Sequence, residues 1–289
     1  DRYATYSGSD PRRAPAVLST IAYVEESFGA WHIKGGLGTL ATLVHERAEK
    51  VGVTFHLNSP VASIDVKKGK AKGITLDSGE VIEADAVIAN ADASLIYNVL
   101  IKGKIRKIKK VRKNIAKADP SLAGFSLLLG MRKDGSEPLN HHTVLFPKDY
   151  DAEFDAIFTH KQPVTEPTIY ICAPRDEAMS KDELLEGWFV LVNAPAHGQE
   201  SFDWNDAEFA RKYANTIIDQ IEARGISVRS RLESITIRTP ADLESAVRAP
   251  GGSIYGTSSN GARAAFMRAK NRSPIKGLYC VGGSAHPGG

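Results

Sequence analysis

Two glycine-rich segments have the composition of ligand-binding turns. In the first, residues 36–41 (Gly-Leu-Gly-Thr-Leu-Ala) fit the pattern G-x-G-x-x-G/A, in which glycines bring the backbone close to a phosphate at the start of a helix. A dinucleotide loop also needs a buried strand before it and an acid at the end of the next strand. Residues 28–34 contain a tryptophan, a histidine and a lysine, and the next apolar segment ends in Asn58. We therefore predict a glycine pair that approaches a flat ligand and starts a helix, in preference to an NAD-type phosphate loop.

The second glycine-rich segment, residues 281–289, follows an apolar run directly. Its sequence is Val-Gly-Gly-Ser-Ala-His-Pro-Gly-Gly, with few bulky side chains. Such backbone lets N–H groups approach an anion or a planar ring closely. A plain strand-to-helix turn is the alternative interpretation, and spacing alone does not separate the two.

Other chemistry-bearing residues favour structural roles. His141 and His142 suggest a metal, but neighbouring residues on a strand point to opposite faces, and no His or Cys pair has zinc-ligand spacing. We predict no metal site. Cys172 and Cys280 lie in apolar runs and are predicted to be inert packing thiols, and no G-x-S-x-G elbow is present.

The elements that position these residues are of two kinds. Residues 1–34 are predicted to be irregular, and helices are predicted over 37–51 and 205–224. Short strands are predicted at 53–57, 61–66, 71–76, 80–83 and 86–89, the last ending in the polar loop 90–92, where open α/β sheets bind ligands. Longer apolar strands are predicted at 124–129, 143–146, 168–173, 188–193, 232–238 and 277–281. This distribution of short and long strands predicts two interleaved domains, one holding 34–100 and 249–289 and the other holding 1–33 and 101–248, with a ligand cleft between them.

Composition bounds the class of protein. The chain has 289 residues, is 42% hydrophobic and 25% charged, and carries a formal charge of +3. These values exclude collagen-like, low-complexity and wholly disordered chains. The two cysteines cannot form a disulfide framework, so we expect a reducing compartment. No run approaches the roughly 18 apolar residues of a membrane-spanning helix.

Residues 102–117 carry nine Lys or Arg and no acid, with Ile105, Ile108, Val111 and Ile115 near one helical face. Nucleic-acid binding is disfavoured, because no aromatic residue is interleaved for base stacking and the rest of the chain is acidic overall. An interfacial helix on an anionic membrane and a solvated helix face both stay open.

Taken together, the sequence resembles the bacterial phytoene desaturase family of FAD-dependent carotenoid desaturases. The resemblance rests on four stretches: residues 2–6, 8–15, 28–31 and 34–36; residues 58–64, 84–87 and 90–92; residues 141–146, 149–150, 154, 168–174 and 191–195; and residues 252–256, 263–266 and 278–289, with the signature His286-Pro287-Gly288. It covers the whole chain and is most specific in the last two stretches. It implies an α/β fold of the amine-oxidase type, with an FAD-binding domain and a substrate domain that has a β-sheet floor.

The resemblance also implies that the fold is incomplete. The family's amino-terminal Rossmann strand and glycine-rich loop have no counterpart here, so we expect a carboxyl-terminal fragment that is inactive alone and binds little or no FAD. By position, the resemblance assigns cofactor contacts to the following residues: Gly35, Gly36, Val61, Gly282, Gly283, His286, Pro287 and Gly288.

The implied reaction is desaturation of a carotenoid precursor such as phytoene. An unactivated allylic C–H needs a hydride acceptor that no side chain provides, so the hydride is expected to pass to flavin N5 in a dry tunnel. An apolar lining is expected from Phe28, Trp31, Phe125, Leu127 and Leu129, and no catalytic base is assigned. Because a long polyene is insoluble in water, we expect a cytoplasmic protein that attaches peripherally to a membrane surface and binds no nucleic acid. The alternatives are a flavin-dependent carotenoid isomerase or retinoid saturase of the same fold, and a non-catalytic membrane-associated binding module.

Overall fold

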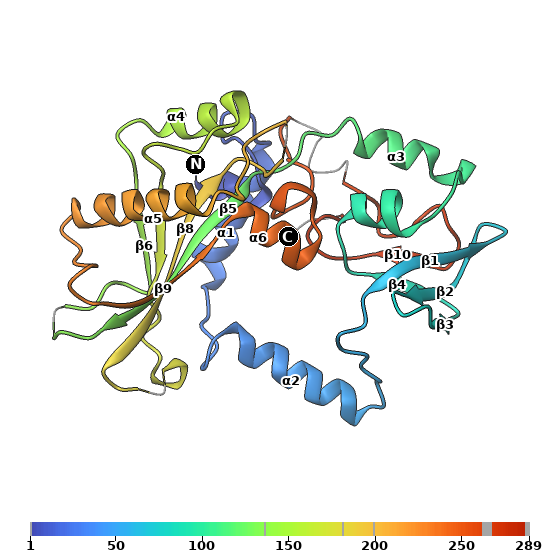
Figure 1. The fold of residues 1–289 in the computed structure, drawn as a ribbon, viewed down its shortest axis with the longest axis horizontal. Helices are drawn as coiled ribbons and strands as arrows, with labels where there is room; N and C mark the ends of the chain where they lie inside the picture. The colour runs from blue at the N-terminus through green and yellow to red at the C-terminus, as the bar shows by residue number, and fades with distance from the viewer. Residues whose placement is uncertain (1, 136, 181, 199, 262–267, 287–289) are drawn as a thin grey trace. The chain divides into compact units, whose positions relative to one another are not determined.

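The computed structural model describes residues 2–135, 137–180, 182–198, 200–261 and 268–286. The chain forms two compact units (Figure 1). Unit 1 holds 1–23, 56–123 and 240–289, and unit 2 holds 24–55 and 124–239. These bounds differ from the predicted domains, because residues 1–23, 101–123 and 240–248 group with unit 1 and residues 34–55 group with unit 2. The labels FAD domain and substrate domain stay predictions.

Unit 1 contains two small sheets and short helices. Its helical elements are η1 (Arg2–Ser7), η2 (Ala16–Leu18), the π-helical η3 (Leu95–Leu100), η4 (Arg106–Ile108), α3 (Lys109–Ile115), α6 (Pro240–Val247) and η7 (Pro250–Gly252), with α1 (Ser19–Phe28) spanning the boundary to unit 2. Its strands are β1 (Val61–Lys67), β2 (Lys70–Leu76), β3 (Val81–Glu83), β4 (Val87–Ala89) and β10 (Leu278–Cys280). Residues 1–34 were predicted to be irregular, and η1, η2 and α1 correct that prediction. No residue of α1 is buried, so it lacks the apolar periodicity that predicts a packed helix.

The strands of unit 1 follow the predicted pattern. β1, β2 and β3 form an antiparallel sheet in that order, and β4 pairs in parallel with β10, with Val87 opposite Leu278. The parallel pair brings residues distant in sequence together, and the loops after both strands leave from the same edge.

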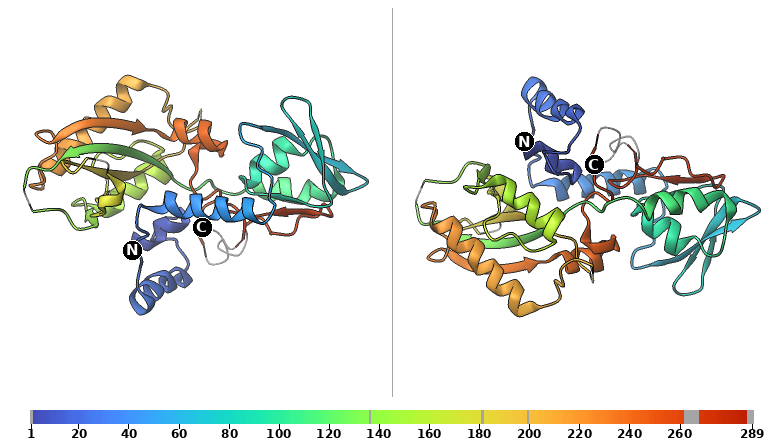
Figure 2. Two further views of the ribbon diagram at one scale, coloured as in Figure 1. Left: turned by 90° about the horizontal axis from the view of Figure 1, so that it is seen from below. Right: turned by 90° about the horizontal axis from the view of Figure 1, so that it is seen from above.

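The apolar stripe of the basic segment points into unit 1. Ile108 is fully buried in the core, and Ile105, Val111 and Ile115 pack against that core. Figure 2 shows η4 and α3 alongside the small sheets of this unit. The stripe is therefore not available for insertion into a membrane, and the segment's outward chemistry is that of its cations.

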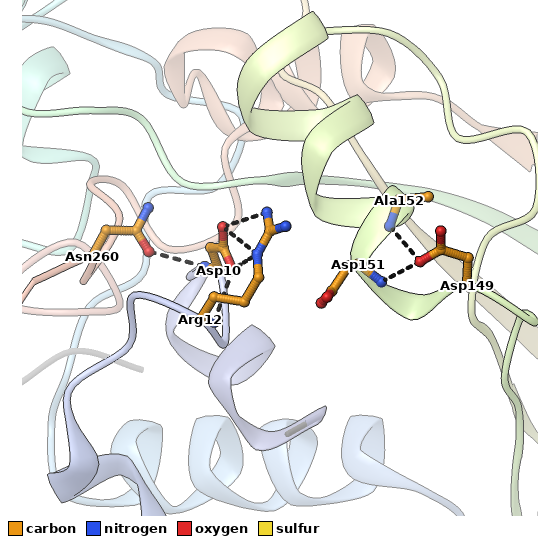
Figure 3. Close-up of polar contacts among 6 residues, drawn as sticks. All are labelled: Asp10, Arg12, Asp149, Asp151, Ala152 and Asn260. Atoms are coloured by element: carbon orange, nitrogen blue, oxygen red, sulfur yellow. Dashed lines mark hydrogen bonds and ion pairs between the residues drawn. The ribbon is translucent and has the colours of Figure 1, made fainter.

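Unit 2 is built on one five-stranded sheet with the strand order β6-β7-β8-β5-β9, in which the pairs β6–β7, β7–β8 and β5–β9 are antiparallel. These strands are β5 (Ala123–Arg132), β6 (His142–Leu145), β7 (Ile169–Cys172), β8 (Leu185–Ala194) and β9 (Leu232–Arg238). Its helical elements are α2 (Leu37–Lys50), α4 (Tyr150–Phe154), η5 (Asp155–His160), η6 (Glu177–Met179) and α5 (Ala207–Glu222). Asp149 caps α4 by accepting the N–H groups of Asp151 and Ala152 (Figure 3).

Helix α5 covers one face of this sheet (Figures 1 and 2). Its buried residues recur at helical spacing, and Tyr213 and nearby Trp204 contact the ring of Phe125 on β5. Burial of this face supplies the apolar core of unit 2.

Helix α2 forms where it was predicted, but no residue along it is buried in the structure, and Leu37 and Val44 are exposed. The predicted strand 53–57 is wrong: the residues are exposed and pair with no described strand. β-Propensity reflects packing on a paired, half-buried surface, and this segment has no such surface.

Candidate functional site

The carboxyl ends of β4 and β10 bring two polar loops together in unit 1. Val281 N–H donates to the Ala89 carbonyl at 3.0 Å, which continues the parallel pairing into the loops. Gly282 follows with a φ of 94°, and a Cβ at that position would collide with Asn90 Oδ1. The position favours glycine, because its left-handed conformation strains other residues and a Cβ would have to displace the Asn90 side chain.

Ser284 links the two loops. Its hydroxyl accepts the N–H of Ala93 at 3.0 Å and donates to the Ala91 carbonyl at 3.3 Å. A third loop closes on the same point, since a Cβ on Gly256 would lie 2.6 Å from Ser284 Cβ. Asp92 lies here as well, and burial is the main cause that raises the pKa of its carboxyl group.

Arg268 is a buried cation that sequence reasoning missed. Its side chain is 5% exposed. Nη1 donates to the carbonyl oxygens of Tyr255 at 2.6 Å and Gly283 at 2.7 Å, and Nη2 contacts Ser7 and Ser259. Desolvation lowers the pKa of this guanidinium. One rigid fork therefore holds the Gly283 loop, the Gly256 loop and η1 together.

A second polar contact ties the amino-terminal segment to the same region. Asp10 is 3% exposed and accepts Arg12 N–H and the Arg12 guanidinium, while Asp10 N–H donates to Asn260 Oδ1 at 2.9 Å (Figure 3). The Asn260 amide nitrogen is buried without a hydrogen-bond partner among the described residues. Asp10 and Arg12 belong to residues 8–15, one of the stretches on which the family resemblance rests, so the sequence pointed to this segment but not to its contact with Asn260.

A cavity of about 640 Å³ opens beside these loops. Its lining includes Asp92, Tyr97, Val111, Gly256, Arg268 and Ser284. It combines apolar side chains of α3 with the polar ends of the glycine loops, which is the mixture expected of a small-molecule site.

The other predicted cofactor residues of unit 1 have structural contacts. The Val61 carbonyl accepts Arg248 Nη1 at 3.3 Å at the start of β1. His286 N–H donates to the Ala269 carbonyl, and its own carbonyl accepts Asn271 Nδ2. Pro287 and Gly288 lie outside the described residues. Cys280 is buried and its pKa is raised by desolvation, in keeping with the predicted inert thiol.

The glycine pair lies in unit 2, at the start of α2. Gly36 is the N-cap residue, with φ 81°, and no side chain caps the first N–H groups of the helix. Gly35 N–H donates to Asp176 Oδ2 at 2.6 Å, and His32 Nε2 lies 2.8 Å from the same oxygen. The bonds from His32 and Gly35 lower the pKa of Asp176.

The predicted substrate residues divide into two groups. Phe28 and Trp31 are exposed, by 69% and 88%. Phe125, Leu127 and Leu129 are at most 2% exposed and lie on the face of β5 that α5 covers. Their burial gives them a packing role, and their contact with substrate stays a prediction.

The opposite face of the sheet is open and was missed. It carries Leu128, Val144, Tyr170, Phe189 and Leu191, which alternate with the core residues of their strands. Leu128, Val144 and Phe189 are 42%, 37% and 36% exposed. Alternation along a strand divides its residues between the two faces of the sheet, but it does not tell which face a helix covers.

Residues 5–188 match the family model described as flavin containing amine oxidoreductase, which is more than half of the chain. The chain belongs to this family. Membership confirms the predicted flavoprotein class, its oxidoreductase character and FAD as the cofactor that such proteins use.

Curated relatives of the chain agree with the predicted resemblance. It is 34% identical to hydroxyneurosporene desaturase of Rubrivivax gelatinosus, over 99% of this chain and 54% of the relative. It is 33% identical to 1-hydroxycarotenoid 3,4-desaturase of Flavobacterium sp. (strain P99-3), over 100% and 58%, and 33% identical to the zeta-carotene-forming phytoene desaturase of Myxococcus xanthus, over 98% and 54%. The chain thus spans about half the length of the curated relatives it matches.

Solved structures show the fold alone. An oxidoreductase from Methanosarcina mazei superposes with a TM-score of 0.64 at 19% identity, covering 99% of this chain and 58% of that one. A putrescine oxidase mutant superposes with a TM-score of 0.52 at 14% identity, covering 85% and 46%. The predicted α/β fold of the amine-oxidase type is confirmed.

The residues present fit part of a flavin dinucleotide. The Gly282 turn has a left-handed backbone that favours glycine, and the first N–H groups of α2, which lack a side-chain cap, are donors suited to an anion or a ring carbonyl.

Proposed function

We propose that the protein containing this chain is an FAD-dependent desaturase that acts on a carotenoid. The observation that carries this proposal is the open apolar face of the β5–β9 sheet in a chain of a flavin-dependent family. A polyene is long, flat and apolar, and a row of exposed apolar side chains across neighbouring strands offers it a matching surface. The similarity to relatives named as carotenoid desaturases supports this substrate class.

The chemistry sets distinct tasks for the residues. When bound, FAD supplies a hydride acceptor for an allylic C–H bond. The glycine turn at Gly282–Gly283 would hold it through backbone groups, with Arg268 fixing the Gly283 carbonyl. The flavin contact assigned to Gly35 and Gly36 stays a prediction. The open sheet face would orient the polyene and exclude water from it. Removal of the second hydrogen as a proton needs only a weak base, and no residue is assigned to it.

The test is product mass after incubation of the full-length enzyme with phytoene and, separately, with a 1-hydroxycarotenoid. Loss of a hydrogen pair in either incubation supports desaturation. A product of unchanged mass supports the isomerase alternative, and a gain of a hydrogen pair supports the saturase alternative. Full-length protein that takes up no FAD and converts nothing supports a binding module.

A matched pair of variants tests the sheet face itself. Leu128→Glu places a charge on the open face, whereas Leu184→Glu changes a leucine that is 64% exposed on a loop. We expect the first variant to lose turnover with its FAD content unchanged, and the second to keep parental turnover. Equal activity of both variants would remove the sheet face from the proposal.

Peripheral membrane attachment forms a separate part of the proposal. No described helix is long and apolar enough to cross a bilayer. With the isoleucine stripe of residues 102–117 packed into unit 1, the attachment we propose is electrostatic, through the cations of that segment to anionic lipid headgroups. We propose a cytoplasmic protein that attaches peripherally to a membrane surface.

A further inference from the structure

A cluster of imidazole and thiol groups lies at one corner of the unit 2 sheet. His142 begins β6 and pairs directly with Cys172, the last residue of β7, so both side chains emerge on the same face. His141 precedes the strand in a bend, and its ring centroid lies 4.4 Å from that of His142. Strand alternation does not apply to His141, which lies before the strand, so the predicted opposite orientation of the two histidines does not rule out a shared site. The missing zinc-ligand spacing in the sequence is no obstacle either, because β6 and β7 bring His142 and Cys172 together.

The donor atoms of these three residues already lie close together. One ligand atom from each of His141, His142 and Cys172 falls within 4.8 Å of the others. Tetrahedral coordination with bonds of about 2.0–2.3 Å needs donor separations near 3.5 Å. His142 is exposed and the other two residues are half-buried, so rotations about side-chain bonds suffice for this contraction.

Neighbouring side chains hold the two imidazole rings in place. His142 Nδ1 lies 2.8 Å from the hydroxyl of Tyr170, which fixes the ring and leaves Nε2 for an ion. The His32 ring packs edge-on against His141 at 4.8 Å and is itself held by Asp176.

We propose that His141, His142 and Cys172 bind one transition-metal ion of the Zn²⁺ type, with solvent in the fourth position. Two imidazoles and a thiolate are donors of borderline to soft character, which select Zn²⁺ or copper over Mg²⁺ and Ca²⁺. The ion would cross-link β6 to β7 at the corner where His32 leads into the glycine pair.

The test is a titration of the reduced 289-residue chain with CoCl₂, followed by ZnCl₂. We expect one Co²⁺ per chain, a thiolate-to-cobalt charge-transfer band in the near ultraviolet, and loss of that band when Zn²⁺ displaces the cobalt. Cys172→Ser should abolish the band, and Cys280→Ser, which changes the buried thiol of unit 1, should keep it.

Histidine variants give a second readout. His142→Gln and Tyr170→Phe should each weaken Co²⁺ binding by at least about tenfold, since a ligand is removed in one and its orienting partner in the other. His160→Gln, an exposed histidine of the same unit, is the control and should bind as the parent does. Far-ultraviolet circular dichroism checks that each variant is folded. Absence of the thiolate band in the parent chain, or equal losses in the His142 and His160 variants, would overturn the proposal.

Discussion

Arg268 Nη1 donates to the carbonyl oxygen of Gly283 at 2.7 Å, from a side chain that is almost fully buried. The same nitrogen reaches the Tyr255 carbonyl, so a single guanidinium fixes two backbone loops. A charged donor in a dry site is worth more than a neutral one, because the carbonyls it serves have no water to replace it.

Replacing Arg268 should therefore destabilise unit 1. Arg268→Ala leaves buried carbonyl oxygens without donors, and we expect a loss of roughly 2–4 kcal/mol in the free energy of unfolding. Arg268→Lys keeps the charge but lacks the planar guanidinium with its several N–H donors, so its free energy of unfolding should lie between those of the parent and Arg268→Ala. Urea unfolding measures both variants, and Lys270→Ala on the neighbouring surface is the control. Parental stability of Arg268→Ala would contradict the role given to this side chain.

Asp176 should govern the mobility of the glycine pair. Because its carboxylate accepts the Gly35 N–H and contacts His32, Asp176→Ala should accelerate hydrogen exchange of the Gly35 amide several-fold. Asp182→Ala removes another turn-capping aspartate of unit 2 and should leave that amide unchanged. Unaltered exchange in the Asp176 variant would mean that other contacts hold the loop.

Acid should weaken the end of α5 through Glu222. The N–H of Arg229, and then its guanidinium, lower the pKa of this carboxyl group. A lowered folded pKa contributes stability above the ordinary glutamate pKa, and that contribution is lost as the pH falls through the folded value. Unfolding measured over a pH series should show a shallower acid loss in Glu222→Gln than in the parent. Glu166→Gln, outside this contact, serves as the comparison, and identical profiles in the two variants would refute the assignment.

Truncation of two neighbouring leucines of β5 should lower the free energy of unfolding by very different amounts. Leu127 is fully buried against the α5 face, so Leu127→Ala should cost about 2–5 kcal/mol of unfolding free energy. Leu128 is 42% exposed on the open face, and Leu128→Ala should cost under about 1 kcal/mol. Chemical denaturation of the two variants distinguishes the faces, and similar losses would show that the open face is covered too.

The cations of residues 102–117 should control membrane attachment. We expect the full-length protein to sediment with anionic liposomes and to be released by high salt, since each cation near the surface contributes on the order of 1 kcal/mol. Replacing Lys107, Lys109, Lys110 and Lys113 with Glu should weaken sedimentation and leave the FAD content intact. The same four changes to Arg keep the charge and should sediment normally. If the Glu variant sediments like the parent, the segment is only a solvated helix face.

Local pattern in the sequence determined most of the strands and the two longest helices. Alternation predicted β1, the turn at residues 77–79 predicted β2 before it, an apolar run predicted the parallel strand β4, and spacing of four residues predicted α5. These signals are readable because burial of one face imposes a period of two or 3.6 on the residues. The family resemblance and the flavin cofactor were likewise accessible, since they rest on short contiguous motifs such as residues 281–286.

Only the tertiary structure decided which residues meet across the chain. Sequence alternation divided β5 into Leu127 and Leu128 faces, but the packing of α5 determined which face is core. In the sequence nothing distinguishes Arg268 from a surface cation, and its role follows from the loops that meet around its guanidinium. His141 lies beside His142 and Cys172 because a bend precedes β6. Such relationships depend on chain segments far apart in sequence, and no local periodicity encodes the contact between them.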